Sequence, residues 1–322
     1  MQQTTGMSAE DHRAALIEHV GADGHVRDVG EAHLAVFRPG NGVLLVEFDE
    51  ISAIRARRGG RPWSGGLARK RGYTTLTIAA DGPTWFRDPA LIAYFDGLTD
   101  EGVFDEYETV VFAGGGMGAY GAGAYSVASP GAVVVLVQPC ATLDPSVAAW
   151  DPRFRAARRL PFGPRYGNAA RMVDAAKAVF VLSDPRRTFD AMHAALFQGD
   201  HVTQLRAPHA GPDVWTQLER IKILDRIVAH AEKGDLTAQS FAQLWRGRRE
   251  DPEWLARVLR ALDVAGRPWL TALWTGEMLR RADNPVARRR LNAALQDLAA
   301  QGREPPSGLR PQPSDGLLLA GE

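Results

Sequence analysis

The stretch TVVFAGGGMGAYGAG, from Thr109 to Gly123, joins an apolar run to a series of small residues through closely spaced glycines. An apolar run of this kind is typical of a buried strand, and the small residues after Met117 suit a helix that packs closely on a sheet. The glycines between them offer no side chain that could react. The stretch therefore predicts a strand, a tight turn and a helix, with only backbone groups at the turn.

The composition of the whole chain limits the class of protein. Its 322 residues carry 38 basic and 38 acidic side chains, which gives no electrostatic reason to expect nucleic acid or an anionic membrane as a partner. A single cysteine, Cys140, excludes an internal disulfide framework and a zinc site built from several cysteines. The polar N-terminus lacks the apolar run of a signal peptide. We expect a cytoplasmic protein without membrane insertion, metal or other cofactor.

Apolar runs alternate with helical segments through the first part of the chain. Residues 9–20 predict a helix, and residues 32–48 predict two strands joined as a hairpin at Pro39 to Gly42. Further strands are expected at residues 74–80, 109–113, 132–138, 178–184 and 201–208. Near-continuous aliphatic strands separated by helices predict a mostly parallel sheet covered on both faces. The fold class is therefore α/β, with residues 1–213 as one domain.

The pattern changes at about Val214, where helices rich in Leu, Arg, Ala and Trp replace the strands. We expect residues 214–300 to form a helical region and residues 301–322, which are rich in Pro and Gly, to be disordered. A helix pair broken at Gly266 to Pro268 is reminiscent of a tetratricopeptide-like hairpin. Tryptophans at helical spacing indicate interhelical core or a surface for a protein partner, namely Trp245, Trp254, Trp269 and Trp274.

The glycine-rich turn has two mechanistic interpretations. In the first, Gly116, Gly118 and Gly121 match the G-x-G-x-x-G spacing at which a helix N-terminus binds the pyrophosphate of a dinucleotide. That fingerprint normally follows the first strand of its sheet and needs an acidic residue after the next strand, where this chain has Gln138 and Pro139. Binding of NAD or FAD is therefore kept as an alternative.

The second interpretation is a nucleophile elbow, G-x-S-x-G, in which a strained strand-to-helix turn lifts a nucleophile above the sheet. Gly114 to Gly118 has this frame, with Gly116 in the position of the serine. Met117 would supply a backbone N–H to an oxyanion hole. The continuation Met117-Gly118-Ala119-Tyr120 resembles the α/β-hydrolase superfamily, and within it a branch of glycan-biosynthesis and accessory-secretion proteins whose elbow reads G-x-S-M-G-G-Y.

The resemblance covers roughly Val43 to Asp213. It includes PTWFRDPAL before the elbow and VQPCATLDPSVAAWDPRF at the end of the next strand. It implies an α/β-hydrolase-like sheet, with Asp184 at the place of the triad acid. It also puts the catalytic histidine on Pro212, three residues after His209. A role in surface-glycan or envelope biology is a further implication of the resemblance.

With glycine at the serine position and proline at the histidine position, the chain lacks the pair that would attack a carbonyl. We interpret it as a catalytically degenerate hydrolase-like protein that binds a small ligand or a protein partner. The vestigial triad positions are Gly116, Asp184 and Pro212, and Asp184 has the alternative role of capping the turn at Pro185. The ligand would contact the elbow residues Gly115, Gly116, Met117, Gly118 and Tyr120.

An active ester or acyl hydrolase, or a transferase, is the alternative enzyme. It would use Cys140 or Ser126 as a displaced nucleophile, together with His209 and Asp184. The ordinary role of a cysteine such as Cys140 is a buried structural thiol. His193, eight residues before His201, fits no compact metal motif, and we expect both at the surface or at strand ends.

Two charged segments could border a pocket. The arginine-rich run from Arg55 to Arg71 falls between two expected strands, in a loop that could bind an anionic ligand or be solvated. The segment from Asp144 to Arg153 could line the cleft or anchor a lid by an ion pair. A third class of function is an interaction module built on the tryptophan-rich helices.

Overall fold

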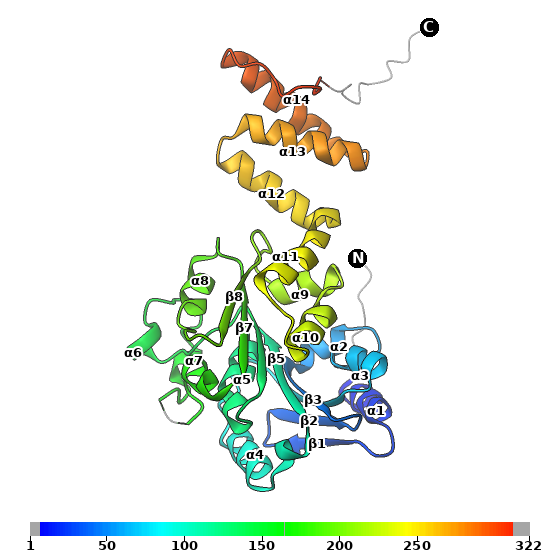
Figure 1. Ribbon diagram of the computed structural model, residues 1–322, viewed down its shortest axis with the longest axis vertical. Helices are drawn as coiled ribbons and strands as arrows, with labels where there is room; N and C mark the ends of the chain where they lie inside the picture. Colours follow the sequence, from blue (N-terminus) through cyan, green and yellow to red (C-terminus); the bar gives the residue numbers. More distant parts are fainter. Residues whose placement is uncertain (1–6, 164, 312–322) are drawn as a thin grey trace. The chain divides into compact units, whose positions relative to one another are not determined.

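The computed structural model describes residues 7–163 and 165–311, and it divides into two compact units, Met1–Arg246 and Gly247–Glu322 (Figure 1). Unit 1 contains the sheet and the helices around it. Unit 2 consists of helices and a short segment that follows them. Most of the tail expected to be disordered, residues 312–322, lies outside the described residues.

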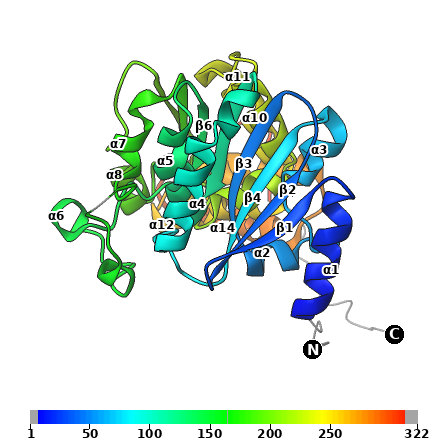
Figure 2. The ribbon, with the colours of Figure 1, turned by 90° about the horizontal axis from the view of Figure 1, so that it is seen from below.

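Unit 1 is built on one eight-stranded sheet with the strand order β1-β2-β4-β3-β5-β6-β7-β8 (Figure 2). Strand β2 runs antiparallel to β1 and β4, and the other neighbouring strands are parallel. The strands are β1 (His25–Val29), β2 (His33–Arg38), β3 (Val43–Glu50), β4 (Thr74–Ala80), β5 (Thr109–Gly115), β6 (Val133–Val137), β7 (Ala178–Ser183) and β8 (Val202–Arg206). This order is that of the α/β-hydrolase fold, so the predicted fold class is confirmed.

The expected hairpin at Pro39 to Gly42 is wrong, because β4 lies between β2 and β3 in the sheet. The antiparallel hairpin is instead β1–β2, in which Val29 pairs with His33. The glycine at 40 serves a different purpose from a hairpin turn. A Cβ on Gly40 would overlap the backbone of Gly72, so this segment needs a glycine where it crosses the start of β4.

Helices cover both faces of the sheet. Helix α5 packs on β3, β5 and β6, and α10 packs on the other face of β5 and β6 (Figure 2). The α-helices of unit 1 are α1 (Ala9–Val20), α2 (Ile51–Ala56), α3 (Gly65–Arg71), α4 (Pro89–Asp100), α5 (Met117–Tyr125), α6 (Pro145–Ala148), α7 (Ala169–Met172), α8 (Thr188–Ala194), α9 (Val214–Arg220), α10 (Leu224–Glu232) and α11 (Ala238–Leu244). Short 3-10 turns occur at Val103–Glu106, Ser126–Ala128, Ala157–Arg159, Val173–Ala175 and Trp245–Glu250.

The division between the units lies at Arg246, whereas the sequence pattern placed a domain boundary at residue 213. The difference comes from α9, α10 and α11. Leu224, Ile227 and Val228 on α10 are buried, and α11 contacts the edge strand β8. These helices cover a face of the sheet that would otherwise expose its apolar side chains, so they belong with the sheet in the packing of unit 1.

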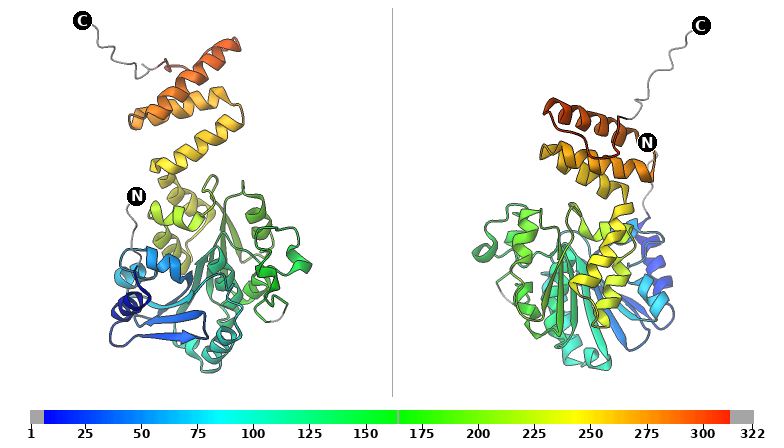
Figure 3. Two further views of the ribbon diagram at one scale, coloured as in Figure 1. Left: turned by 180° about the vertical axis from the view of Figure 1, so that it is seen from behind. Right: turned by 45° about the horizontal axis from the view of Figure 1, so that its top comes forward.

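Unit 2 is a short stack of helices, α12 (Pro252–Val264), α13 (Pro268–Arg281) and α14 (Pro285–Ala300) (Figure 3). Asp251 and Asn284 cap α12 and α14 by accepting backbone N–H groups of the first turn. Trp254 is buried and meets the ring of Trp274 edge-on, with ring centroids 5.4 Å apart. These two tryptophans thus pack between helices, and a partner surface on unit 2 stays a prediction.

Glu47 is a buried carboxylate in the middle of β3. Its oxygens accept the backbone N–H groups of Trp63 and Ser64, at 3.3 and 3.0 Å, and the hydroxyl of Thr77 at 3.2 Å. Burial raises the pKa of Glu47 to about 7, and the negative charge of Asp49 acts in the same direction. Glu47 therefore holds the segment before α3 against the sheet. With a pKa of about 7, its carboxyl group gains or loses a proton near neutral pH.

We predict that Glu47 makes the folded protein less stable as the pH rises. The pKa of about 7 in the folded state exceeds the ordinary 4.5, so the folded chain holds this proton more tightly than the unfolded chain. The resulting stabilisation is complete below the ordinary pKa and is lost as the pH rises through the folded value. The difference between the two pKa values corresponds to about 3 kcal/mol in the free energy of unfolding.

Urea unfolding of the wild type and of Glu47→Gln at about pH 5 and about pH 8 measures this effect. The wild type should lose more free energy of unfolding between the two pH values than the variant does. Glu101→Gln, at an exposed position, is the matched control and should keep the wild-type dependence. An equal pH dependence of wild type and Glu47→Gln would contradict the prediction.

Candidate functional site

The turn between β5 and α5 has the strained conformation of a nucleophile elbow. Gly116 stands alone between the two elements, with φ 56° and ψ −116°, a region that residues with a side chain rarely adopt. Its N–H donates to the carbonyl of Val137 on the neighbouring strand β6, at 2.9 Å. Gly116 is thus the single residue at the sharp turn between strand β5 and helix α5.

The glycines around this turn have different reasons to be glycine. A Cβ on Gly114 would overlap the backbone of Gly118, and a Cβ on Gly118 would overlap the carbonyl oxygen of Phe48 on β3. A Cβ on Gly116, by contrast, would meet no atom within 4 Å. The glycines on either side are therefore required by close packing, whereas Gly116 faces open space.

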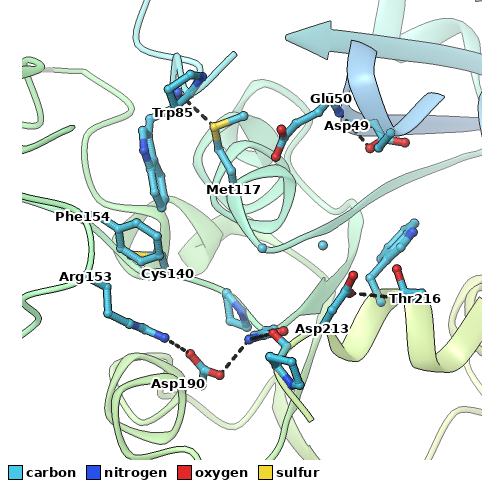
Figure 4. Close-up of a pocket in the computed structure, with 18 of the residues that line it drawn as sticks. Asp49, Glu50, Trp85, Met117, Cys140, Arg153, Phe154, Asp190, Asp213 and Thr216 are labelled. Atoms are coloured by element: carbon cyan, nitrogen blue, oxygen red, sulfur yellow. Dashed lines mark hydrogen bonds and ion pairs between the residues drawn. The ribbon is translucent and has the colours of Figure 1, made fainter. Parts of the chain in front are cut away.

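That open space is part of a cavity of about 420 Å³ above the ends of β3, β5 and β6 (Figure 4). Its apolar surface comes mainly from Trp85, Met117, Phe154 and Trp215. Polar side chains complete the lining, namely Asp49, Glu50, Arg57, Gln138, Cys140, Arg153, Asp190, Asp213 and Thr216. A cavity with apolar walls and a few convergent polar groups at the carboxyl ends of parallel strands is the usual form of a ligand site.

The elbow residues expected to contact a ligand are only partly in this cavity. Gly115, Gly116 and Met117 line it. Gly118 and Tyr120 are buried and do not, which corrects the sequence-based expectation. Helix α5 turns Gly118 towards β3, and the Tyr120 hydroxyl donates to the carbonyl of Tyr166 at 2.8 Å.

The dinucleotide-binding alternative is weakened in the same way, because two of the three glycines in its spacing do not line the cavity. Gly121, like Gly118, lies over β3, and a Cβ there would come within 2.5 Å of Phe48 Cδ1. Of the three glycines in the G-x-G-x-x-G spacing, only Gly116 lines the cavity. The spacing therefore reflects how closely α5 sits on the sheet.

Asp184 and Pro212 occupy different surroundings. Asp184 is buried, and its carboxylate accepts the N–H groups of Arg186 at 3.0 Å and Gly211 at 3.3 Å. It caps the turn after β7 and holds the loop that leads to α9, as its alternative role required. Pro212 lines the cavity, and its carbonyl accepts Nε2 of Gln138 at 2.9 Å. Gly116 and Pro212 therefore share one cavity that Asp184 does not reach.

Two of the displaced candidates, Ser126 and His209, lie outside the cavity lining. The Ser126 hydroxyl is buried and donates to the carbonyl of Gly123 at 2.9 Å, within its own helical turn. His209 stands in the loop before α9 with φ 62°. The lining of the cavity over Gly116 thus includes neither of these two candidates.

Cys140 lines the cavity and has neighbours that the sequence did not reveal. Its Sγ lies 3.3 Å from Nε2 of His193, and Oδ2 of Asp151 lies 3.1 Å from the same nitrogen. His193 is fully buried, which corrects the expectation of a surface or strand-end position. Cys140 lies in the loop after β6, Asp151 lies in the segment after α6, and His193 lies on helix α8. No local spacing marks such a group, because the fold brings its members together.

The hydrogen bonds of His193 leave no base for the thiol. Its Nδ1 accepts the N–H of Ala141 at 3.3 Å, so the ring proton is on Nε2 and is donated to Asp151. The Cys140 thiol points to the carbonyl of Thr142, 3.6 Å away. Burial raises the pKa of the Cys140 thiol, with Asp151 adding to the effect, and burial lowers the pKa of His193. These shifts favour the neutral form of both groups, and a neutral thiol is a weak nucleophile.

The two guanidinium groups of the cavity are already paired. Arg57 forms ion pairs with Asp49 and, at 3.1 Å, with Glu219. It is the only member of the arginine-rich run in the lining, and α2 and α3 replace the loop expected there. The run, for which an anion-binding loop and a solvated loop were both open, thus contributes one arginine to the cavity, and that arginine is already paired with carboxylates.

Arg153 contacts Asp151 at 2.7 Å and also forms an ion pair with Asp190, to which Gln138 donates at 2.8 Å. The segment that ends at Arg153 therefore both anchors itself by an ion pair and lines the cavity. Across residues 7–163 and 165–311, no group of three His, Cys, Asp or Glu side chains could hold a metal ion. Within the same residues, no helix combines the length and apolar character needed to cross a membrane.

No protein-family model matches this chain, and no curated protein matches it. Several solved structures are similar to it. The capsule O-acetyltransferase of Neisseria meningitidis serogroup A has a TM-score of 0.39 and 10% identity, over 62% of this chain and 93% of that chain. A putative esterase from Staphylococcus aureus has a TM-score of 0.37 and 13% identity, over 65% and 83% of the two chains.

A glycosylation associate protein complex from Streptococcus agalactiae has a TM-score of 0.38 and 13% identity, over 71% of this chain and 47% of that chain. At such low identities a residue's role does not transfer from one chain to another. The chemistry of this cavity has to come from its own residues.

We predict that position 116 is accessible from the cavity. In Gly116→Cys the new thiol would stand in open space at the start of α5, whereas Cys140 is buried with a raised pKa. Iodoacetamide should therefore alkylate the variant on the order of tenfold faster than the wild type. The positive φ of this position should lower the free energy of unfolding by about 1–3 kcal/mol.

Mass spectrometry of the alkylated peptides measures the rate at each cysteine. Ser126→Cys is the matched control, because it places a second thiol at a buried position on the turn after the same helix. Alkylation of residue 116 no faster than that of Cys140 in a folded variant would show that the elbow does not open into the cavity.

Proposed function

We propose that this protein is a catalytically silent α/β-hydrolase-like protein that binds a small molecule in the cavity above Gly116. The observation that carries the proposal is the elbow itself. Gly116 keeps the strained backbone of a nucleophile position and faces open space, yet it has no side chain. A turn conformation that usually presents a nucleophile is thus occupied by glycine, the residue that adopts it without steric cost.

The remaining parts of an acyl-transfer site are also missing from the cavity. Among the residues that the structure describes, no histidine lines the cavity, and Pro212, the position to which the sequence resemblance assigns the catalytic histidine, is one of the lining residues. Asp184 accepts two backbone N–H groups instead of orienting an imidazole. Without a nucleophile and its base, the site lacks the first step of ester hydrolysis.

What is left suits binding. The first-turn N–H groups of α5 have no side-chain cap, and Gly116 and Met117 open into the cavity, so an oxygen acceptor of a ligand could lie against them. Trp85, Phe154 and Trp215 supply apolar area around it. The surface-glycan or envelope setting implied by the sequence resemblance belongs to this proposal as its biological context.

A thiol-dependent hydrolase or transferase is the second candidate, because Cys140 lines the cavity 3.3 Å from His193. For this chemistry, His193 would have to give up its hydrogen bonds with the N–H of Ala141 and the carboxylate of Asp151, so that a ring nitrogen could accept the proton of the thiol. This enzyme would be supported over the silent protein if the wild type hydrolysed short p-nitrophenyl esters, if Cys140→Ser and His193→Ala both lost that activity, and if His209→Ala kept it.

We predict that the purified wild type neither hydrolyses short p-nitrophenyl esters nor reacts stoichiometrically with a fluorophosphonate probe. Gly116→Ser should behave in the same way, because the cavity would gain a hydroxyl but still lack a histidine to activate it. An intact serine esterase serves as the positive control for both reagents. Stoichiometric labelling of the wild type by the probe would contradict the proposal.

A further inference from the structure

The cavity above Gly116 carries more negative than positive groups. Four carboxylates line it, from Asp49, Glu50, Asp190 and Asp213, against the two guanidinium groups of Arg57 and Arg153. Each guanidinium also contacts a carboxylate outside the lining, which is Glu219 for Arg57 and Asp151 for Arg153. The positive charge of the lining is therefore already matched by the residues around it.

Glu50 and Asp213 are the carboxylates left over. Neither forms an ion pair with a cationic side chain in the described part of the chain, and both are exposed to the cavity. They come from different elements, Glu50 from the end of β3 and Asp213 from the residue before α9 (Figure 4). Burial and the nearby charge of Asp49 raise the pKa of Glu50, the direction expected where negative charges are crowded.

Aromatic faces accompany these carboxylates. Trp85 and Phe154 meet edge-on with ring centroids 4.9 Å apart, and Trp215 meets Trp63 in the same way at 5.2 Å. The guanidinium of Arg153 already lies over the Phe154 ring at 5.1 Å. Carboxylates and aromatic rings in the lining of one cavity favour an organic cation, because such a cation can gain from both the charge and the ring faces.

We infer that the ligand of this cavity is a small organic cation, a primary amine or a quaternary ammonium compound, held between Glu50 and Asp213 against the aromatic wall. The inference rests on the proposed function, since it names the class of molecule bound at the same site. The cationic group lies at the carboxylates, and the apolar remainder of the ligand lies along Trp85 and Phe154.

Three ligands of nearly equal size and different charge test the inference, namely benzylamine, benzyl alcohol and benzoate. Titration of the full chain followed by tryptophan fluorescence and by ligand-observed NMR gives their affinities. Benzylamine should bind about three- to tenfold more tightly than benzyl alcohol, and benzoate most weakly. The preference for benzylamine should decrease as salt is added.

Two variants assign the preference to residues. Glu50→Gln and Asp213→Asn should each weaken benzylamine about three- to fivefold and leave benzyl alcohol unchanged. Asn at 213 can still accept the N–H of Thr216 that Asp213 caps at 2.9 Å, so α9 should keep its start. Glu101→Gln is the matched control and should change neither affinity.

The outcomes separate this inference from the proposed function. Equal or tighter binding of benzoate, or benzylamine affinities unchanged in both variants, would overturn the cationic ligand while leaving a binding cavity. Binding of Ca²⁺ or Mg²⁺ that Glu50→Gln abolishes would overturn it in favour of a metal ion. Labelling of the wild type by the fluorophosphonate probe would instead overturn the silent hydrolase-like protein, whatever the ligand preference.

Discussion

The close seating of helix α5 on strand β3 is the contact on which the rest of unit 1 depends. At Gly118 the helix backbone lies so near the Phe48 carbonyl that even one methyl group would not fit. This approach fixes the direction of α5, and Gly116 has to take a positive φ to bring the chain from β5 into that direction. The N-terminus of the helix then opens between the ends of β3 and β6, where the cavity lies. Fold and site thus follow from one backbone contact.

The sequence predicted a mostly parallel sheet and the position of most of its strands, but it did not predict the order of the strands in the sheet. Runs such as Thr74–Ala80 are apolar throughout, and each of the runs expected from residue 74 onward is a strand. Strand β1 (His25–Val29) contains Arg27 and Asp28 and buries one residue, so its composition did not mark it as a strand. The insertion of β4 between β2 and β3 depends on pairing between distant segments, which local turn residues do not encode.

The candidate site shows the same division between local and distant information. Gly116 and Pro212 could be expected near each other because the family resemblance assigns them to the serine and histidine positions of one site, and both line the cavity. Glu50 follows directly from the end of a buried strand and could have been found from that position. The grouping of Cys140, Asp151 and His193 could not, because it depends on how the segment after α6 folds back against α8.

The empty space at Gly116 also has a genetic consequence. Depending on the codon, glycine becomes serine and proline becomes histidine through one or two base changes each. The parts that are hard to rebuild, the close approach of α5 to β3 and the room above residue 116, are present in this chain. A hydroxyl at 116 and an imidazole at 212 would enter a cavity that already exists. Few nucleotide changes therefore separate this binding cavity from one that carries the two missing side chains.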